Sequence, residues 1–532
     1  MCIKFFKLFL KQNLFVITLL FLISISLSIS SFIQARIIDS LIIFDFHNFS
    51  VGIFGLLIAY TCFLLFSFLQ SIKVNEIKQK INLELRQQIM SKLVSADYDE
   101  FHKRDIGTYT SWLVNDINQF EKLATEPFYK LLTSSISALV AGISLFFIHW
   151  SIALAIFFEV AILLQIPRIF KKKIDYESKT ITIKNEKFVK YISDYLSGYD
   201  TMYIFQKLHL LLKKFMNQSY ILSIANYNYS KSIAKVSLVS GIGNILCNVS
   251  MYALAGYLAY IQEISIGSIA AISAISTSLF NSVANISPWI ANIKSSKPIL
   301  EKFNQIEITQ DPILKTNFTY ETEKVIELSN LSFNYMNKQI IKNITYTFEN
   351  GKKYLIIGGS GTGKSTLLDI ISGKLKNYQG SIKIFGEEVS DLTSRQIQDI
   401  LMIVDQKPYI FNASVRENLL LDDEFTDKEL LEVLENMELI NWIKETKDGL
   451  DTNLGEKGKK ISGGQIQRIA LSRALLRNNN ILLLDEITAN LDTETAAKIE
   501  YFLFSRSDLT IIMVTHRIND RLLKMVDGIL EL

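Results

Sequence analysis

Cysteine is scarce in this sequence, and the few cysteines lie far apart. The 532 residues include only Cys2, Cys62 and Cys247. None belongs to a Cys-x-x-Cys pair, so the sequence excludes a disulfide scaffold and a cysteine-ligated zinc site. Cys62 and Cys247 fall in apolar segments, where we expect small buried side chains.

Charged residues are also few. They make up 20% of the chain, while hydrophobic residues make up 49%. An ordinary soluble domain carries about 25% charged residues. The net charge of +3 is too small to indicate a nucleic-acid partner. Because the deficit of charge is concentrated before about residue 304, this part of the chain is predicted to lie in a lipid bilayer.

Long apolar runs account for that deficit. A helix needs about 20 apolar residues to cross a bilayer, and six segments meet this requirement once Ser, Asn and Gly are tolerated. The first is too long for the apolar core of a signal peptide, so we expect it to be retained. The predicted spans cover residues 14–33, 51–69, 131–150, 152–169, 236–261 and 264–290.

The distribution of Lys and Arg predicts the orientation of these spans. Residues 39–50 and the turns near 150 and 262–265 contain no Lys or Arg, whereas residues 73–130 and 168–235 are rich in both. Basic segments stay on the cytoplasmic side. The N-terminus, both basic loops and the C-terminal part are therefore expected in the cytoplasm of a cell with this protein in its plasma membrane. The many Ile, Lys and Asn residues indicate a bacterium.

Both basic loops have helical patterns, so the spans are expected to continue as helices beyond the bilayer. Gly107 and Gly198 are expected to interrupt them, one in each loop.

After about residue 304 the apolar runs become short. Residues 325–328, 354–357, 481–484 and 511–514 are predicted to be buried strands, and the helical patterns between them indicate an α/β layer on a parallel sheet. The expected domains are a transmembrane domain at 1–305 with six helices, a linker at 306–323, and an α/β P-loop NTPase domain at 324–532.

One glycine-rich motif predicts phosphate binding. It fits GxxxxGK[ST], follows a predicted strand and opens a predicted helix. Backbone N–H groups and the helix N-terminus favour the phosphates of ATP. Lys364 can reach the β- and γ-phosphates and Ser365 can bind Mg²⁺. A chance glycine-rich turn is the alternative. We expect ATP to contact Gly358, Gly359, Ser360, Gly361, Thr362, Gly363, Lys364, Ser365 and Thr366.

A second motif ends another predicted strand. Asp485 and Glu486 follow four apolar residues, and α/β sheets bind ligands at the C-terminal ends of their strands. Asp485 is expected to hold Mg²⁺ and Glu486 to polarise the attacking water. A core strand that ends in a solvated acidic pair is the alternative.

Ile461-Ser462-Gly463-Gly464-Gln465 resembles the signature of ATP-binding cassette (ABC) transporters. The other family motifs occur in order. Residues 489–492 resemble the D-loop. The resemblance implies that Tyr335 stacks on adenine and that Gln406 senses the γ-phosphate and binds Mg²⁺ with Ser365 and Asp485. It implies that His516, otherwise more often a structural residue, contacts the γ-phosphate.

The resemblance extends over nearly the whole chain. Residues 452–458 look like the X-loop of exporters, and residues 97–116 and 195–205 look like their two cytoplasmic loops. Six spans followed by one nucleotide-binding domain imply a half-transporter of the type I exporter kind. Ser462, Gly463, Gly464 and Gln465 of one subunit would then cover the ATP bound to another.

The resemblance therefore implies a partner subunit. Family heterodimers often carry one impaired site, whereas Glu486, His516 and the signature are intact here, which favours a homodimer over a heterodimer. The expected function is ATP-driven export of an amphipathic or hydrophobic substrate such as a peptide, lipid or drug. An importer with the exporter fold, for example of a metal chelate, and an ATP-binding membrane sensor or regulator are the alternatives.

Glu159 lies in the fourth predicted span. An ionisable group in the bilayer is costly, so it should face the protein interior or a partner. Contact with a cationic substrate and contact between two helices are both compatible with the sequence.

Overall fold

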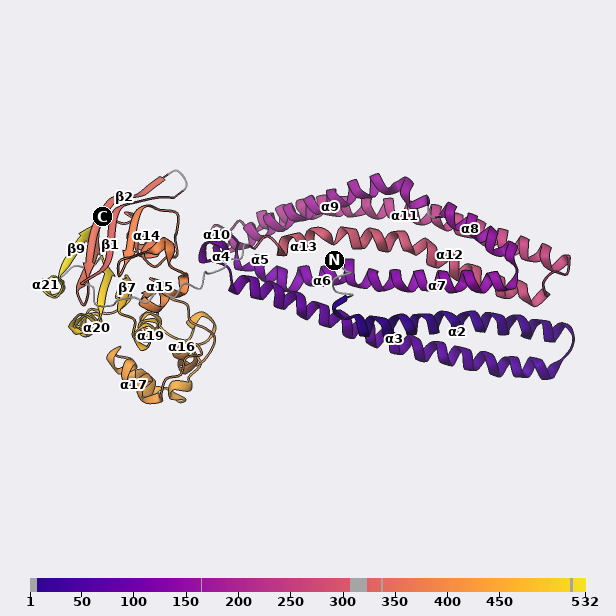
Figure 1. The fold of residues 1–532 in the computed structure, drawn as a ribbon. Coiled ribbons are helices and arrows are strands. Elements are labelled where there is room, and N and C mark those ends of the chain that lie inside the picture. The colour runs from indigo at the N-terminus through magenta and orange to yellow at the C-terminus, as the bar shows by residue number, and fades with distance from the viewer. Residues whose placement is uncertain (1–6, 164, 307–322, 336–337, 517–519) are drawn as a thin grey trace. The chain divides into compact units, whose positions relative to one another are not determined.

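The computed structural model describes residues 7–163, 165–306, 323–335, 338–516 and 520–532 (Figure 1). The chain divides into two compact units. One contains Met1–Leu93 and Asp105–Ile306, and the other contains Val94–Arg104 and Glu307–Leu532. Most of the predicted linker, residues 307–322, lies outside the described residues.

The first unit is built from long helices that run side by side (Figure 1). The long helices are α2 Leu10–Ile42, α3 Phe46–Val94, α7 Glu126–Ile148, α8 Trp150–Leu163, α9 Ile166–Ser197, α11 Leu208–Tyr260 and α12 Ile266–Ser295. Short elements connect or extend them: α5 Ile106–Ser111, η1 Trp112–Asp116, α6 Ile117–Phe120, η2 Glu121–Thr125, α10 Tyr199–Ile204 and α13 Lys297–Phe303.

Five helices in the described part of the chain are long and apolar enough to cross a membrane. Residue 164, inside the span predicted at 152–169, lies outside the described residues. Helix α8 ends at Leu163, and α9 begins at Ile166 with a proline in its first turn. Helix α8 has 14 residues, which span about 21 Å, less than the hydrocarbon core of about 30 Å. The described residues of the fourth predicted span thus fall in the apolar helix α8 and in the first turn of α9.

The predicted helical continuation of the spans is confirmed. Helices α3 and α11 have 49 and 53 residues, or about 74 and 80 Å at 1.5 Å per residue. Gly198 ends α9, as predicted. Gly107 does not interrupt a helix, because it lies inside α5. The break instead precedes α5, at residues 103–105, where Asp105 has the extended backbone of an N-cap.

The core of this unit is apolar and contains residues from several helices. Phe280, Leu145 and Ile152 are fully buried in it, and the buried Cys247 belongs to the same cluster. Cys62 is only partly buried, so the expectation of a buried side chain is wrong there.

The second unit contains two sheets. A parallel sheet has the strand order β6-β7-β8-β3-β9, and an antiparallel sheet has the order β2-β1-β4-β5. The parallel strands are β3 Lys353–Ile357, β6 Leu401–Val404, β7 Ile481–Asp485, β8 Thr510–Val514 and β9 Gly528–Glu531. The antiparallel strands are β1 Lys324–Tyr335, β2 Lys338–Glu349, β4 Gln379–Ile384 and β5 Glu387–Glu388.

Three of the four predicted strands, in β3, β7 and β8, are adjacent in the parallel sheet. The strand predicted at 325–328 is real, but its assignment to the parallel sheet is wrong. It belongs to β1, which pairs antiparallel with β2 and β4. Buried strands have continuous apolar runs in either kind of sheet, so the run alone could not distinguish them.

Helices cover the sheets and complete two apolar cores. They are α14 Lys364–Ile371, α15 Ser394–Ile400, α16 Val415–Leu420, α17 Asp427–Asn436, α18 Ile440–Glu445, α19 Gly463–Leu476, α20 Thr493–Ser505 and α21 Asp520–Leu523. Helix α4 Tyr98–His102 precedes α5 in the chain but groups with this unit.

Candidate functional site

The glycine-rich motif forms a turn between β3 and α14, as predicted. Gly363 is the N-cap of α14 and has φ +101°, a conformation that L side chains rarely adopt. A Cβ atom at Gly363 would lie 2.8 Å from Ile340 Cγ2. The turn therefore requires glycine at this position for both backbone and space.

Lys364 is buried at the start of α14. Its ammonium donates to the carbonyl oxygens of Gly358 and Gly359, at 3.0 and 2.7 Å. Thr362 Oγ1 also donates to Gly359 O, at 3.0 Å. The lysine ammonium thus lies across the turn that is expected to hold the phosphates. A phosphate oxygen can replace the two carbonyl oxygens as its hydrogen-bond acceptor.

Asp485 is buried at the C-terminal end of β7, beside Ser365. Its Oδ1 atom has no hydrogen-bond partner among the described residues. Burial raises the pKa of Asp485, the hydrogen bond with Ser365 lowers it, and the charge of Glu486 raises it further. A buried carboxylate oxygen without a partner, next to a serine hydroxyl, fits a Mg²⁺ site.

The carboxylate of Glu486 contacts two other residues that the sequence predicts for the site. Gln406 Nε2 donates to Glu486 Oε2 at 2.7 Å, and His516 Nε2 lies 3.0 Å from Glu486 Oε1. Gln406 follows β6, and His516 follows β8. Glu486 has φ +51°, unusual for a residue with a side chain, and its N–H donates to Val514 O. This turn places the carboxylate between the other two side chains.

The signature residues form the first turn of α19. Ser462 is the N-cap, and its hydroxyl accepts from the N–H of Gln465, whose side chain accepts from the N–H of Ser462. A Cβ atom at Gly464 would lie 2.9 Å from Leu491 Cδ2 and 3.1 Å from Asn490 O. Gly464 therefore lets the D-loop pack closely against this turn, while Gly463 stays at the helix N-terminus.

Tyr335 stands apart from this cluster, at the end of β1 in the antiparallel sheet. Its ring is 57% exposed and makes an edge contact with Phe333. The exposed ring is free to stack on a planar group.

Asp492 caps α20 by accepting from the N–H of Thr495, and that N–H holds the pKa of Asp492 below its usual range.

Gln467 is a residue that the sequence analysis did not single out. It is buried in α19, with Nε2 3.4 Å from Gln406 O and Oε1 3.4 Å from Asn490 N. It thus connects the segment that carries Gln406 to the D-loop. Its place directly before Arg468, within the signature region, was the signal available in the sequence.

Lys374 was also missed, and it connects α4 to the segment that carries Gln406. Its ammonium lies 2.7 Å from Asp405 and 3.4 Å from Asp369, and 5.6 Å from the centre of the Tyr98 ring in α4. Burial opposes its charge, but pairing with Asp405 and Asp369 raises the pKa of Lys374. Both Tyr98 and Lys374 belong to the second unit, so this contact joins α4 to the segment that carries Gln406 within that unit.

We expect Lys374→Met to lower the free energy of unfolding of the second unit by about 1–3 kcal/mol, because two carboxylates lose their partner. Lys376→Met is the matched control. Lys376 pairs with Asp97 at 3.1 Å and is 44% exposed, so its loss should cost less than about 1 kcal/mol. Denaturant unfolding of both variants measures the difference. Equal losses would show that the Lys374 contacts have no special weight.

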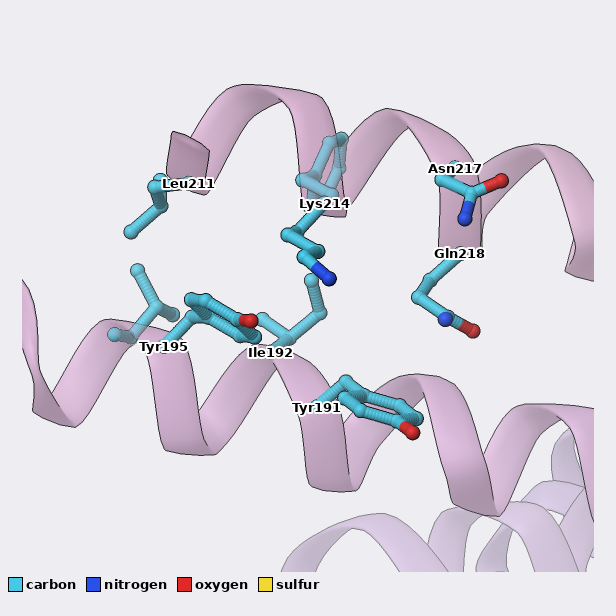
Figure 2. Close-up of a pocket in the computed structure, with 9 residues that line it drawn as sticks. Tyr191, Ile192, Tyr195, Leu211, Lys214, Asn217 and Gln218 are labelled. Carbon is cyan, nitrogen blue, oxygen red and sulfur yellow. The ribbon is translucent and has the colours of Figure 1, made fainter. Parts of the chain in front are cut away.

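Two features of the first unit concern the membrane helices. Glu159 of α8 accepts a hydrogen bond from Ser250 of α11, the helix contact that the sequence allowed. A cavity of about 110 Å³ lies between α9 and α11. Figure 2 shows that Lys214 and Gln218 of α11 point toward the helix that carries Tyr191 and Tyr195. Tyr191 is 47% exposed, so this is an open surface groove.

Comparison with known proteins identifies both units. Residues 14–283 match the family model of the ABC transporter transmembrane region, and residues 341–489 match that of the ABC transporter. The structure resembles a bacterial Atm1-family ABC exporter solved with ATP bound, with a TM-score of 0.82 over 98% of this chain and 93% of that one, at 19% identity. This likeness concerns the fold.

Among curated relatives, a protein of Rickettsia bellii named as an export ATP-binding/permease protein is 26% identical, over 99% of this chain and 92% of its own. An ATP-dependent lipid A-core flippase of Francisella tularensis is 24% identical, over 85% of this chain and 76% of its own. A lactococcin-A transport/processing protein of Lactococcus lactis is 24% identical, over 87% and 65%. The chain belongs to the ABC transporter family, as a membrane-embedded half-transporter with an ATP-binding domain.

Proposed function

We propose that this chain is one half of a homodimeric pump that hydrolyses ATP to export an amphipathic or hydrophobic molecule, such as a peptide, lipid or drug. The observation that carries the proposal is the convergence of Gln406 and His516 on the Glu486 carboxylate. A carboxylate that polarises water next to a γ-phosphate needs such neighbours to fix its orientation. An ATP-binding sensor would not require this constellation.

ATP would bind with its adenine on Tyr335 and its phosphates on the turn from Gly358 to Thr366. Lys364 would exchange its contacts with Gly358 and Gly359 for contacts with the β- and γ-phosphates. Ser365, Gln406 and Asp485 would hold Mg²⁺, which neutralises the charge that develops on the phosphates. Glu486 would accept a proton from the attacking water, and His516 would contact the γ-phosphate.

The signature turn would complete the site of a second copy. Its hydrogen bonds within the described residues are local to α19, which leaves the N-terminus of a 14-residue helix open to an anion. Two ATP molecules between two copies would hold the domains together, and hydrolysis would release them. ATP thereby shifts the membrane helices between two states by its different affinity for each.

Complementation between two inactive variants tests this arrangement. Lys364→Ala removes the phosphate lysine and Ser462→Arg blocks the signature, so each purified chain is expected to be inactive. Mixed dimers, isolated through two different tags, contain one intact site. We expect them to recover about half of the wild-type ATPase rate, since one of two equivalent sites is restored. Inactive mixed dimers would contradict pairing between two copies of this chain.

Export is the direction favoured by the names of the relatives from Rickettsia bellii and Lactococcus lactis. Uptake of substrate into inverted vesicles, where the ATP-binding domain faces outward, would support export. Uptake only into right-side-out vesicles loaded with ATP would assign the exporter fold to import instead.

A further inference from the structure

A cavity of about 190 Å³ lies among the membrane helices, within the first unit. It is lined by residues of α2, α3, α7 and α12. An apolar cavity of about 150 Å³ in another protein accommodates benzene, so this one has room for a group the size of a sugar ring or a peptide unit. The lining residues are Ser24, Leu27, Ser28, Ser30, Ser31, Gln34, Tyr60, Ser137, Ala141, Ala274, Ile275 and Ser278.

The lining is polar but carries no charge. Eight of the twelve residues have a hydroxyl or amide group, and none is Asp, Glu, Lys, Arg or His. A charged ligand group would find no counter-ion in this lining, and its desolvation would go uncompensated. A purely apolar group would leave without partners those hydroxyl and amide groups of the lining that the protein itself does not satisfy. The chemistry that fits is an uncharged group with both hydrogen-bond donors and acceptors.

Helix packing explains only some of these serines. Ser30 and Ser31 donate to Leu27 O within α2, and Ser24 bonds to Ser137 of α7, so small hydroxyl residues let these helices approach. Ser28 is different. The residue lines the cavity with an exposed fraction of 9%, and its hydroxyl makes no hydrogen bond to another described residue.

Gln34 and Tyr60 complete the polar lining from two helices. Gln34 Nε2 donates to Tyr60 Oη at 2.8 Å. This leaves the Gln34 carbonyl as an acceptor and the Tyr60 hydroxyl hydrogen as a donor. Together with Ser28 they present three hydrogen-bonding groups to the cavity.

The cavity lies along the middle of α2. Gln34 and Ser24 are 8 and 18 residues before the end of that helix at Ile42, or about 12 and 27 Å at 1.5 Å per residue. At this depth the polar groups need partners from the protein, from water that fills the cavity or from a ligand that displaces that water.

We propose that this cavity binds the uncharged, hydroxyl- or amide-bearing head group of the amphipathic molecule that the pump moves. The inference rests on the proposed transport function, and it narrows the substrate class. Anionic and cationic head groups are excluded by the neutral lining. Head groups that carry hydroxyls and head groups that carry amides offer the same donors and acceptors, and the experiment distinguishes the two.

The test is equilibrium binding by calorimetry, with the full chain in lipid nanodiscs, no nucleotide, and empty nanodiscs subtracted. The probes share one decyl chain: decyl glucoside, N-decanoyl-alanyl-alanine amide, decyl sulfate and decyltrimethylammonium. We expect one or both uncharged probes to bind, and the tighter one identifies the source. Preferential binding of either charged probe, or binding of none of the four, would overturn the proposal.

Variants at Ser28 link this binding to the cavity. Ser28→Ala should weaken the uncharged probe about three- to tenfold through loss of one hydrogen bond, and Ser28→Leu should fill the space and abolish binding. Ser26→Ala is the matched control, because Ser26 is buried on the same helix, does not line the cavity and donates to Leu22 O at 2.8 Å. If Ser28→Ala binds like the wild type in a monodisperse sample, the cavity is not the site.

The result is independent of hydrolysis. A chain that binds the uncharged probe through Ser28 but shows no ATPase activity would disprove the pump and keep the site. A chain with normal ATPase activity, in which the Ser28 variants bind the probe like the wild type, would keep the pump and disprove the site.

Discussion

Glu486→Gln should reduce ATP hydrolysis by about 10²–10⁴-fold, the usual contribution of a general base, while ATP still binds. The amide has the same shape as the carboxylate, so the turn at φ +51° and the backbone bond to Val514 should persist. It cannot take a proton from water. The expected state is a dimer that retains two ATP molecules, measured as steady-state phosphate release beside nucleotide retained per chain.

Glu494→Gln provides the matched control. Glu494 lies in the first turn of α20, where its side chain is 81% exposed and pairs with Lys498. The same chemical change at that position should leave hydrolysis within about twofold of the wild type, since exposed ion pairs contribute little. Hydrolysis that survives in Glu486→Gln would remove Glu486 from the role of base and return the sensor alternative to consideration.

The ATP site could be predicted from the sequence because each of its parts is a local motif. The segment from Lys353 to Lys364 combines a strand, glycines with positive φ and a helix start in twelve residues. Their geometry follows from those residues alone. Glu486 and His516 follow adjacent strands β7 and β8 of a parallel sheet, so their proximity follows from the fold.

Other features depend on contacts between distant segments, and no local pattern contains them. Gln467 meets Gln406 across 61 residues, and Lys374 meets Asp405 across 31 residues. The serine-lined cavity requires four helices at once, whereas the sequence shows only that the spans contain many serines.

Asp485→Asn should stabilise the nucleotide-free chain while it abolishes most Mg²⁺-dependent hydrolysis. Burial and the neighbouring Glu486 raise the pKa of Asp485, against the hydrogen bond to Ser365. A carboxyl whose folded pKa is raised favours folding when protonated, and this stabilisation is lost as the pH rises through the folded pKa. At neutral pH the charge is therefore a cost, and asparagine removes it. Relief of about 1 kcal/mol would raise the melting temperature by about 2–4 °C.

When Mg²⁺ and ATP are added, the order of stability of the wild type and Asp485→Asn should reverse. Mg²⁺ would give Asp485 Oδ1 the partner that the described residues do not supply, so the wild type should gain more stability from Mg²⁺ and ATP than Asp485→Asn does. Hydrolysis by the variant should fall about 10- to 100-fold with the loss of a ligand or of its water contact. The advantage of the nucleotide-free variant should shrink as the pH is lowered and the wild-type carboxyl takes up its proton.

Asp527→Asn is the control of opposite sign. Burial opposes the charge of Asp527, but the Lys353 N–H at 2.8 Å and the Lys352 ammonium at 3.1 Å hold its pKa below the usual range. Its ionised form favours folding above the pKa of the unfolded chain, so the amide should lower the melting temperature at neutral pH. If both variants destabilise the nucleotide-free chain, the Asp485 carboxylate stabilises the fold as Asp527 does, and it is not a group held for Mg²⁺. If Asp485→Asn alone stabilises it, the carboxylate of Asp485 lowers the stability of the nucleotide-free chain and is retained because it binds Mg²⁺.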